Sequence, residues 1–307
     1  MRGDAMILFI SHDLYQKAIR QLSGQEGSEK PFRSRKLPGN LHLELLDGKT
    51  DEISWTDLQD DGSSNHTLIT FLSDRYADLK TVSAYAIKTI WYNPSGKMAP
   101  EPMPVQDLDI RHFDKLLLAS SSLHIPTLAQ CLTWWDEWDV PENVRRHSLT
   151  VSQAAYKLAV MMRNKGIAIN PVLTHRGGLL HDLDKIKTLH LVNAHGQKAA
   201  AFLEKEGFPE IAGIVREHIM STILNPNADN RSWEVKLVYF CDKLAEGDQL
   251  VPFNQRLSAL YDRYPDYKII MQQAEGPVWR MSDQICSILS IPSHANLISM
   301  LKGLRNP

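Results

Sequence analysis

Four histidines and two aspartates between residues 147 and 242 are the residues best suited to metal chemistry: His147, His181, Asp182, His195, His218 and Asp242. Imidazole nitrogens and carboxylate oxygens are ligands that divalent transition metals prefer. Asp182 follows two leucines, and burying an unpaired carboxylate is costly, so a cation or strong donors are expected beside it. Each residue alone also fits a hydrogen-bonded core position. The six together favour a metal site.

The elements that must position these residues are helices. From residue 141 onward, apolar residues recur at helical spacing, and Gly or Pro separates the segments. We predict helices at residues 141–166, 171–182, 191–206, 209–220, 233–246, 265–289 and 292–304, with Ser232 as the N-cap of the fifth. The six candidate ligands fall on five of these helices. Residues 141–307 are therefore expected to form an all-α domain.

The first 122 residues show a different pattern, in which short β-rich apolar runs come before and after a helical stretch. Strands are expected at residues 6–10, 41–46, 67–72 and 88–92, with a helix at 76–86. A strand, a helix and a strand in close succession predict a parallel sheet, here of the Rossmann-like kind. The basic stretch Arg33–Lys36 is expected to be a solvated loop, with a phosphate contact as the alternative. The chain is thus predicted to be multidomain, with an α/β domain followed by an all-α domain.

Residues 123–140 are expected to link the two domains. This segment contains Trp134, Trp135 and Trp138, which we expect to pack the domains together; a stacking platform for a base is the alternative.

Composition excludes some classes of function. The chain has 307 residues and a formal net charge of −2, so it lacks the basic excess of a general nucleic-acid binder. No apolar run approaches the roughly 20 residues that span a bilayer, and no membrane association is expected. The three cysteines are far apart and odd in number, which favours a reducing compartment. A cytoplasmic protein is the expectation, and the oligomeric state is left open.

The order of the candidate ligands resembles the HD-domain metal-dependent phosphohydrolases, from about Arg146 to Tyr264. Leu179-Leu180-His181-Asp182 carries the family signature, and the segments 194–200, 211–218 and 242–244 resemble the helices that follow it. The resemblance implies that one metal is held by His147, His181, Asp182 and Asp242. Asp182 would bridge to a second metal held by His195 and His218. Two divalent ions are implied, and the ligand types admit Fe, Mn, Zn, Ni or Mg.

The same resemblance implies hydrolysis of a phosphomonoester or phosphoanhydride, in a nucleotide or another small phosphorylated metabolite. The two further histidines indicate the dinuclear subgroup, similar to bacterial symmetrical diadenosine-tetraphosphate hydrolases. A divalent metal lowers the pKa of water to about 7, which makes the water a nucleophile near neutral pH. The alternative is a regulatory module that binds a metal and a nucleotide without turnover.

Asp182 and Lys185 are the candidate catalytic residues. Lys185 lies one helical turn after Asp182 and either neutralises a phosphate oxygen or forms an ion pair with Asp182 or Asp184. Asp184 stands where many family members have Gly, and it either alters the loop or adds a carboxylate behind the ligands. Three arginines are candidate substrate contacts: Arg145, Arg146 and Arg176.

Residues 6–118 resemble the haloacid-dehalogenase-like phosphatases. Ser11 matches their second motif, and Ser73-Asp74 through Asp78 resembles their fourth. The nucleophilic Asp-x-Asp motif is missing, so aspartyl-phosphate chemistry has no nucleophile. We therefore expect a degenerate domain in which Asp74 and Asp78 are structural. A phosphatase centred on Asp74 is a third hypothesis.

Overall fold

The computed structural model describes residues 6–10, 14, 17–18, 34–37, 41–45, 68–85, 87–101, 103–113, 124–189, 191 and 194–303. Its contacts divide the chain into Met1–Gln130, here called the sheet unit, and Cys131–Pro307, here called the helical unit. The division falls inside helix α5 (Leu128–Glu137), within the segment that the sequence suggested as a linker.

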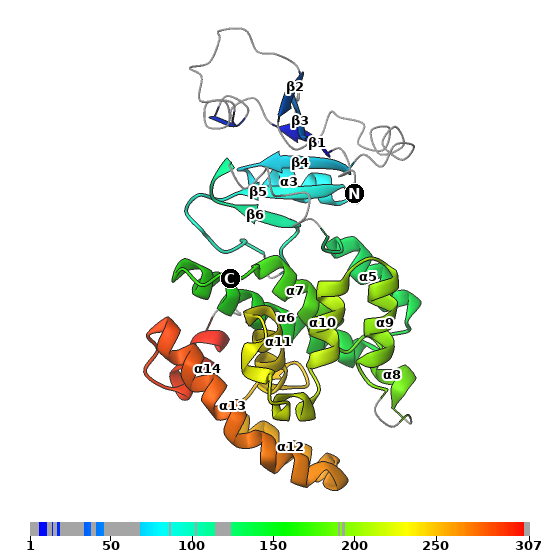
Figure 1. Ribbon diagram of the computed structural model, residues 1–307, viewed down its shortest axis with the longest axis vertical. Helices are drawn as coiled ribbons and strands as arrows, with labels where there is room; N and C mark the ends of the chain where they lie inside the picture. Colours follow the sequence, from blue (N-terminus) through cyan, green and yellow to red (C-terminus); the bar gives the residue numbers. More distant parts are fainter. Residues whose placement is uncertain are drawn as a thin grey trace. The chain divides into compact units, whose positions relative to one another are not determined.

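The sheet unit is built on a six-stranded sheet with the order β2-β3-β1-β4-β5-β6 (Figure 1). All neighbouring strands are parallel except β2 and β3. The strands are β1 (Met6–Ile10), β2 (Ser34–Leu37), β3 (Leu41–Leu45), β4 (Leu68–Ser73), β5 (Lys88–Tyr92) and β6 (Leu108–Ile110). Helix α3 (Tyr76–Ser83) connects β4 to β5. The predicted parallel sheet is confirmed, whereas its Rossmann-like and haloacid-dehalogenase-like identities stay predictions.

Two details of this unit bear on the expectations. The basic stretch Arg33–Lys36 was expected to be a solvated loop, but strand β2 covers most of it, so that expectation was wrong. Pairing of β2 with β3 outweighs the polar composition of the stretch. Asp78 is buried, accepts a hydrogen bond from Ser73 Oγ (3.1 Å) and pairs with Arg75 (3.2 Å). These contacts fit a structural role. Ser11, the proposed second-motif residue, lies outside the described residues.

The helical unit contains a helix within each of the seven predicted segments. These helices are α6 (Glu142–Asn164), α7 (Pro171–Leu180), α9 (Gln197–Lys205), α10 (Pro209–Glu217), α11 (Trp233–Asp242), α13 (Lys268–Leu289) and α14 (His294–Lys302). Ser232 caps α11, as predicted, by accepting from Val235 N. Its remaining described elements are α8 (Lys185–Thr188), η4 (Met220–Leu224), η5 (Ala228–Asn230), α12 (Phe253–Arg263), η6 (Pro265–Tyr267) and a hairpin of β7 (Ala245–Glu246) and β8 (Gln249–Leu250). The strictly all-α expectation thus missed a small hairpin.

Helix α7 is the centre of the helical unit, and every residue in it is buried. It packs against α6, α10 and α11 (Figure 1). Two glycines permit this packing: a Cβ on Gly178 would lie 2.6 Å from Ser152 Cα, and one on Gly177 would lie 2.7 Å from the Ile214 side chain. Asn170 starts the helix by accepting hydrogen bonds from the first free amides. The C-terminal end of α7 is thereby held in the core, directly before the His-Asp pair.

The tryptophan cluster of α5 packs within the helical unit. Trp134 and Trp138 form edge or tilted ring contacts with Phe202 of α9, at centroid distances of 5.4 and 5.1 Å. Trp135 Nε1 donates to Leu179 O (3.0 Å), one turn from the His-Asp pair. These rings therefore support the helices that carry candidate ligands. The expectation that they pack the two domains together stays a prediction.

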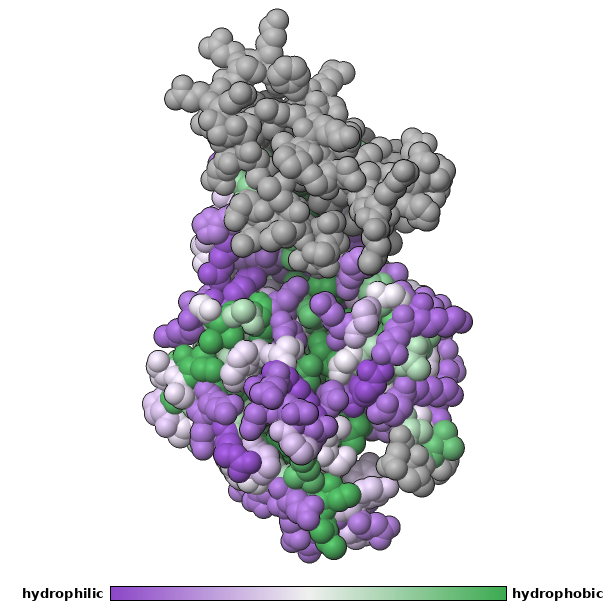
Figure 2. Space-filling view, viewed as in Figure 1, coloured by the Kyte–Doolittle hydropathy of each residue, from purple (hydrophilic) through white to green (hydrophobic). Residues whose placement is uncertain are grey.

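The surface of the helical unit in Figure 2 is mostly hydrophilic, with apolar patches between the polar residues. All three cysteines are buried. Within the described ranges, helices that combine the length and apolarity required to cross a bilayer do not occur.

Candidate metal centre

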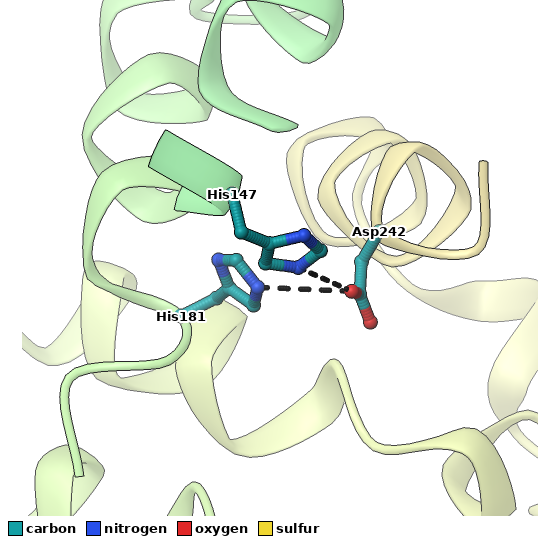
Figure 3. A group of neighbouring side chains, drawn as sticks. All are labelled: His147, His181 and Asp242. Atoms are coloured by element: carbon teal, nitrogen blue, oxygen red, sulfur yellow. Dashed lines mark hydrogen bonds and ion pairs between the residues drawn. The ribbon is translucent and has the colours of Figure 1, made fainter. Parts of the chain in front are cut away.

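Three of the predicted ligands form a first group: His147 near the start of α6, His181 just after α7, and Asp242 at the end of α11 (Figure 3). Asp242 Oδ1 lies 3.1 Å from His147 Nε2 and 3.8 Å from His181 Nε2. All three side chains are buried. The group contains one carboxylate and two imidazoles from three helices that are separate in the sequence.

The other three predicted ligands form a second group: Asp182, His195 and His218. Asp182 Oδ1 lies 3.0 Å from His195 Nε2 and 3.6 Å from His218 Nε2. In each group, the potential ligand atoms lie within 4.8 Å of one another. Asp182 and His218 are buried, whereas 32% of the His195 side chain is exposed. The second group is therefore the one that solvent reaches.

The Nδ1 atom of each of the four histidines faces an acceptor on the protein. The acceptors are Gly247 O for His147 (2.9 Å), Gly178 O for His181 (2.8 Å), Asp184 Oδ1 for His195 (2.9 Å) and Val215 O for His218 (2.5 Å). A carbonyl or carboxylate oxygen only accepts, so each Nδ1 must carry a proton and donate. Whenever such a ring is neutral, its Nε2 therefore carries a lone pair that faces the site.

This arrangement makes several acceptors converge. The Nε2 atoms of His195 and His218 lie 3.2 Å apart and both face Asp182 Oδ1. His181 Nε2 is fully buried and has no hydrogen-bond partner among the described residues. Lone pairs and carboxylate oxygens repel one another at these distances unless a proton or a cation lies between them. The donor set therefore fits divalent cations, which such nitrogen and oxygen ligands bind.

Asp182 connects the two groups because its oxygens point in different directions. Oδ1 faces the second group, as described above. Oδ2 lies 3.5 Å from His181 Nε2 and 3.8 Å from His147 Nε2 in the first group. One carboxylate thus presents an oxygen to each group, which is the geometry of a bridging ligand.

Two lysines hold the buried carboxylates in their charged form. Burial by itself would raise the pKa of Asp182, but Lys185 Nζ lies 2.5 Å away and, with the nearby imidazoles, holds that pKa well below its ordinary value. Burial likewise opposes the charge on Asp242, and Lys243 outweighs it, so the pKa of Asp242 is also low. Lys243 was not among the predicted site residues. Its position next to Asp242 in a buried run was the available signal.

The imidazoles differ in how readily they bind a proton. Burial lowers the pKa of His181 to about 3, so this ring is neutral and available as a ligand. Burial also opposes the charge on His195, but its contacts with Asp182 and Asp184 raise its pKa to about 9. A cation at the second group would therefore replace a proton on His195.

The three arginines predicted to bind substrate differ in their exposure and in their partners. Arg146 is half-exposed on α6, 3.9 Å from Glu142. Arg145 donates to Val140 O (2.7 Å) and pairs with Asp136 (2.7 Å), which fastens the turn between α5 and α6. Arg176 has no exposed surface, and its Nη1 lies 2.9 Å from His175 Nδ1. A guanidinium without exposed area is badly placed to meet a substrate from solvent.

Gly196 is needed where the second group approaches the start of α9. Its φ of +76° lies in the left-handed region, which suits glycine. A Cβ there would lie 2.9 Å from Val215 O and 3.3 Å from His218 Cε1. The glycine therefore lets His195 and His218 come together.

Comparison with known proteins finds a family match that includes the site. Residues 144–247 match the HD domain family, and this range contains all six residues of the two groups. A curated relative is the uncharacterized protein MJ0778 of Methanocaldococcus jannaschii, 41% identical over 88 residues. The match covers 28% of this chain and 51% of that protein, about half of its length. The search of solved structures gave no match.

Residues 144–247 are therefore an HD domain, as the resemblance implied. Domains of this family are typical of metal-dependent hydrolases, and the two His/Asp groups fit metal sites.

Proposed function

We propose that this protein is a metal-dependent phosphohydrolase that cleaves a phosphomonoester or phosphoanhydride bond in a nucleotide or a similar small phosphorylated metabolite. The observation that carries the proposal is the Asp182 carboxylate, which presents one oxygen to each of two imidazole-containing groups. Such an arrangement suits two cations held close together, the kind of site that supports in-line displacement at phosphorus.

Each residue then has a role. His147, His181 and Asp242 would hold one divalent cation, His195 and His218 a second, and Asp182 would bind both. When bound, the cations would lower the pKa of the attacking water and offset the negative charge on the phosphoryl oxygens. The Nδ1 hydrogen bonds to protein oxygens fix the orientation of all four rings, which keeps the ligand atoms in place.

Lys185 is the proposed contact to the transferred phosphoryl group. Its ammonium lies at the edge of the site, 2.5 Å from Asp182 Oδ2, and 32% of its side chain is exposed. It can therefore reach a phosphate oxygen while it stays close to the carboxylate. Arg146 is a further proposed contact, since its side chain is half-exposed. Arg145 would have to leave Asp136 to take part, and the buried Arg176 is not included.

The test is a screen of phosphorylated metabolites and nucleotides against protein loaded with one defined metal at a time. We expect metal-dependent release of phosphate or nucleotide, and loss of at least about 100-fold in rate for Asp182→Ala, because a direct ligand should matter more than an outer contact. Asp74→Asn in the sheet unit should keep the activity. Loss of activity in Asp74→Asn with retention in Asp182→Ala would contradict the proposal.

The regulatory alternative is an outcome of the same experiment. Tight nucleotide binding without turnover, across all metals tested, would overturn the hydrolase proposal and favour a module that senses its ligand. We further propose that the protein acts in the cytoplasm on a soluble small-molecule substrate, in line with its composition.

A further inference from the structure

Asp184 is a buried residue that lies next to the candidate metal site. Its carboxylate has no role in the proposed reaction. Its side chain has no exposed surface. It lies in the turn between α7 and α8, two residues after Asp182, and its hydrogen bonds reach forward to the residues around the start of α9. A buried charge in this position must be held by strong donors, and the donors that hold it show what it does.

Three hydrogen bonds satisfy the carboxylate. Oδ1 accepts from His195 Nδ1 (2.9 Å) and from Gly196 N (3.0 Å), and Oδ2 accepts from Ala199 N (2.9 Å). Two of the donors are backbone amides at the start of α9, where helix amides lack partners within the helix. The third is the ring of a residue whose opposite nitrogen faces Asp182 at 3.0 Å.

From this geometry we propose that Asp184 is a positioning residue that holds His195 with Nδ1 protonated and Nε2 directed at Asp182, and thereby completes the second cation site. The inference rests on the proposed function. His147, His181 and His218 rest on backbone carbonyls, and His195 alone among the four rests on a carboxylate. A carboxylate partner also increases the basicity of the ring and so strengthens it as a ligand.

Asp184 acts on α9 and on the ring at the same time. Its bonds to Gly196 and Ala199 fix the direction in which α9 begins, and His195 directly precedes Gly196. Because 32% of the His195 side chain is exposed, packing restrains this ring less than the buried rings. The Asp184 carboxylate provides the missing restraint.

The test is a titration of the full chain with Mn²⁺ alone, by calorimetry, in the wild type and in Asp184→Ala. We expect two sites in the wild type and a loss of roughly 10- to 100-fold in affinity at the second site of the variant, with the first site unchanged. Asp184→Asn, which keeps an acceptor for Nδ1, should lie between the two. Equal second-site affinity in wild type and Asp184→Ala would overturn the proposal.

Thr188→Val is the matched control. Thr188 Oγ1 donates to Asp184 O (2.8 Å), so this variant disturbs the same buried turn without touching the Asp184 carboxylate. We expect its second-site affinity to equal that of the wild type. A loss in Thr188→Val as large as that in Asp184→Ala would show a general effect on the turn and overturn the positioning role.

A second readout uses the protein without metal. The Nδ1 proton of His195, assigned by its absence in His195→Ala, should exchange slowly in the wild type and be lost from the NMR spectrum of Asp184→Ala. If the wild type shows this proton but binds no Mn²⁺, the proposed function fails and the Asp184–His195 pairing stands. If Mn²⁺ binds at two sites and the proton is equally protected in both proteins, the positioning role fails and the proposed function stands.

Discussion

The two groups of candidate ligands share Asp182 but are supported in different ways. The first, with His147, His181 and Asp242, is fully buried and comes from α6, α11 and the end of the buried helix α7. The second combines Asp182 with residues beside the start of α9 and the end of α10, and part of His195 reaches solvent. The first group is thus part of the hydrophobic core, whereas the second is assembled at its edge. We expect the first to matter more for stability and the second to respond more to pH.

The largest contrast is expected in stability. Asp242→Ala would leave the buried Lys243 ammonium without its carboxylate, which should cost about 3–5 kcal/mol in the free energy of unfolding. His195→Ala removes a partly exposed ring and should cost about 1–2 kcal/mol. Urea unfolding of the metal-free proteins measures both. Equal losses would show that the two groups are not supported differently.

The next contrast concerns pH. The pKa of His195 is raised to about 9 in the absence of a cation, so below that pH the ring holds a proton that a cation must displace. Affinity at the second group should therefore rise about tenfold per pH unit up to about pH 9 and then level off. His181, with a pKa of about 3, adds no such slope to the first group over the same range. Calorimetry with Mn²⁺ at several pH values tests this, and identical slopes at both sites would contradict it.

The smallest effect is expected for Lys185. Its ammonium lies at the site but is not one of the ligands, so Lys185→Ala should lower kcat/KM about tenfold while both cations still bind. Lys185→Arg should recover part of the loss, because a positive charge remains. Steady-state kinetics together with metal analysis distinguishes a substrate contact from a residue that supports the cation site. Loss of a cation in Lys185→Ala would mean that Lys185 supports the site and does not contact the substrate.

The sequence predicted the helical unit well because several of its helices are amphipathic and most have clear start or stop signals. Asn170-Pro171 begins α7 and Ser232 begins α11, and both signals are local. The hairpin β7–β8 could not be predicted, because its two-residue strands are too short for a periodic pattern. Helix α12 was also missed, although its buried residues Phe253, Arg256, Leu257 and Leu260 follow helical spacing.

The same limit applied at the site. The six candidate ligands were apparent from residue type and order, but the split of the Asp182 oxygens between two groups needs three-dimensional positions. Sequence suggested two roles for Asp184, and the structure shows its contacts to His195 and α9. Arg176 was a candidate substrate contact in the sequence, and only the packing of α7 shows that it is buried.

The most direct test of the central claim is anomalous X-ray scattering from crystals of the Mn²⁺-loaded protein. We expect two manganese peaks, one next to His147, His181 and Asp242 and the other next to His195 and His218. One oxygen of Asp182 should lie beside each peak. A single peak, or peaks away from Asp182, would contradict it.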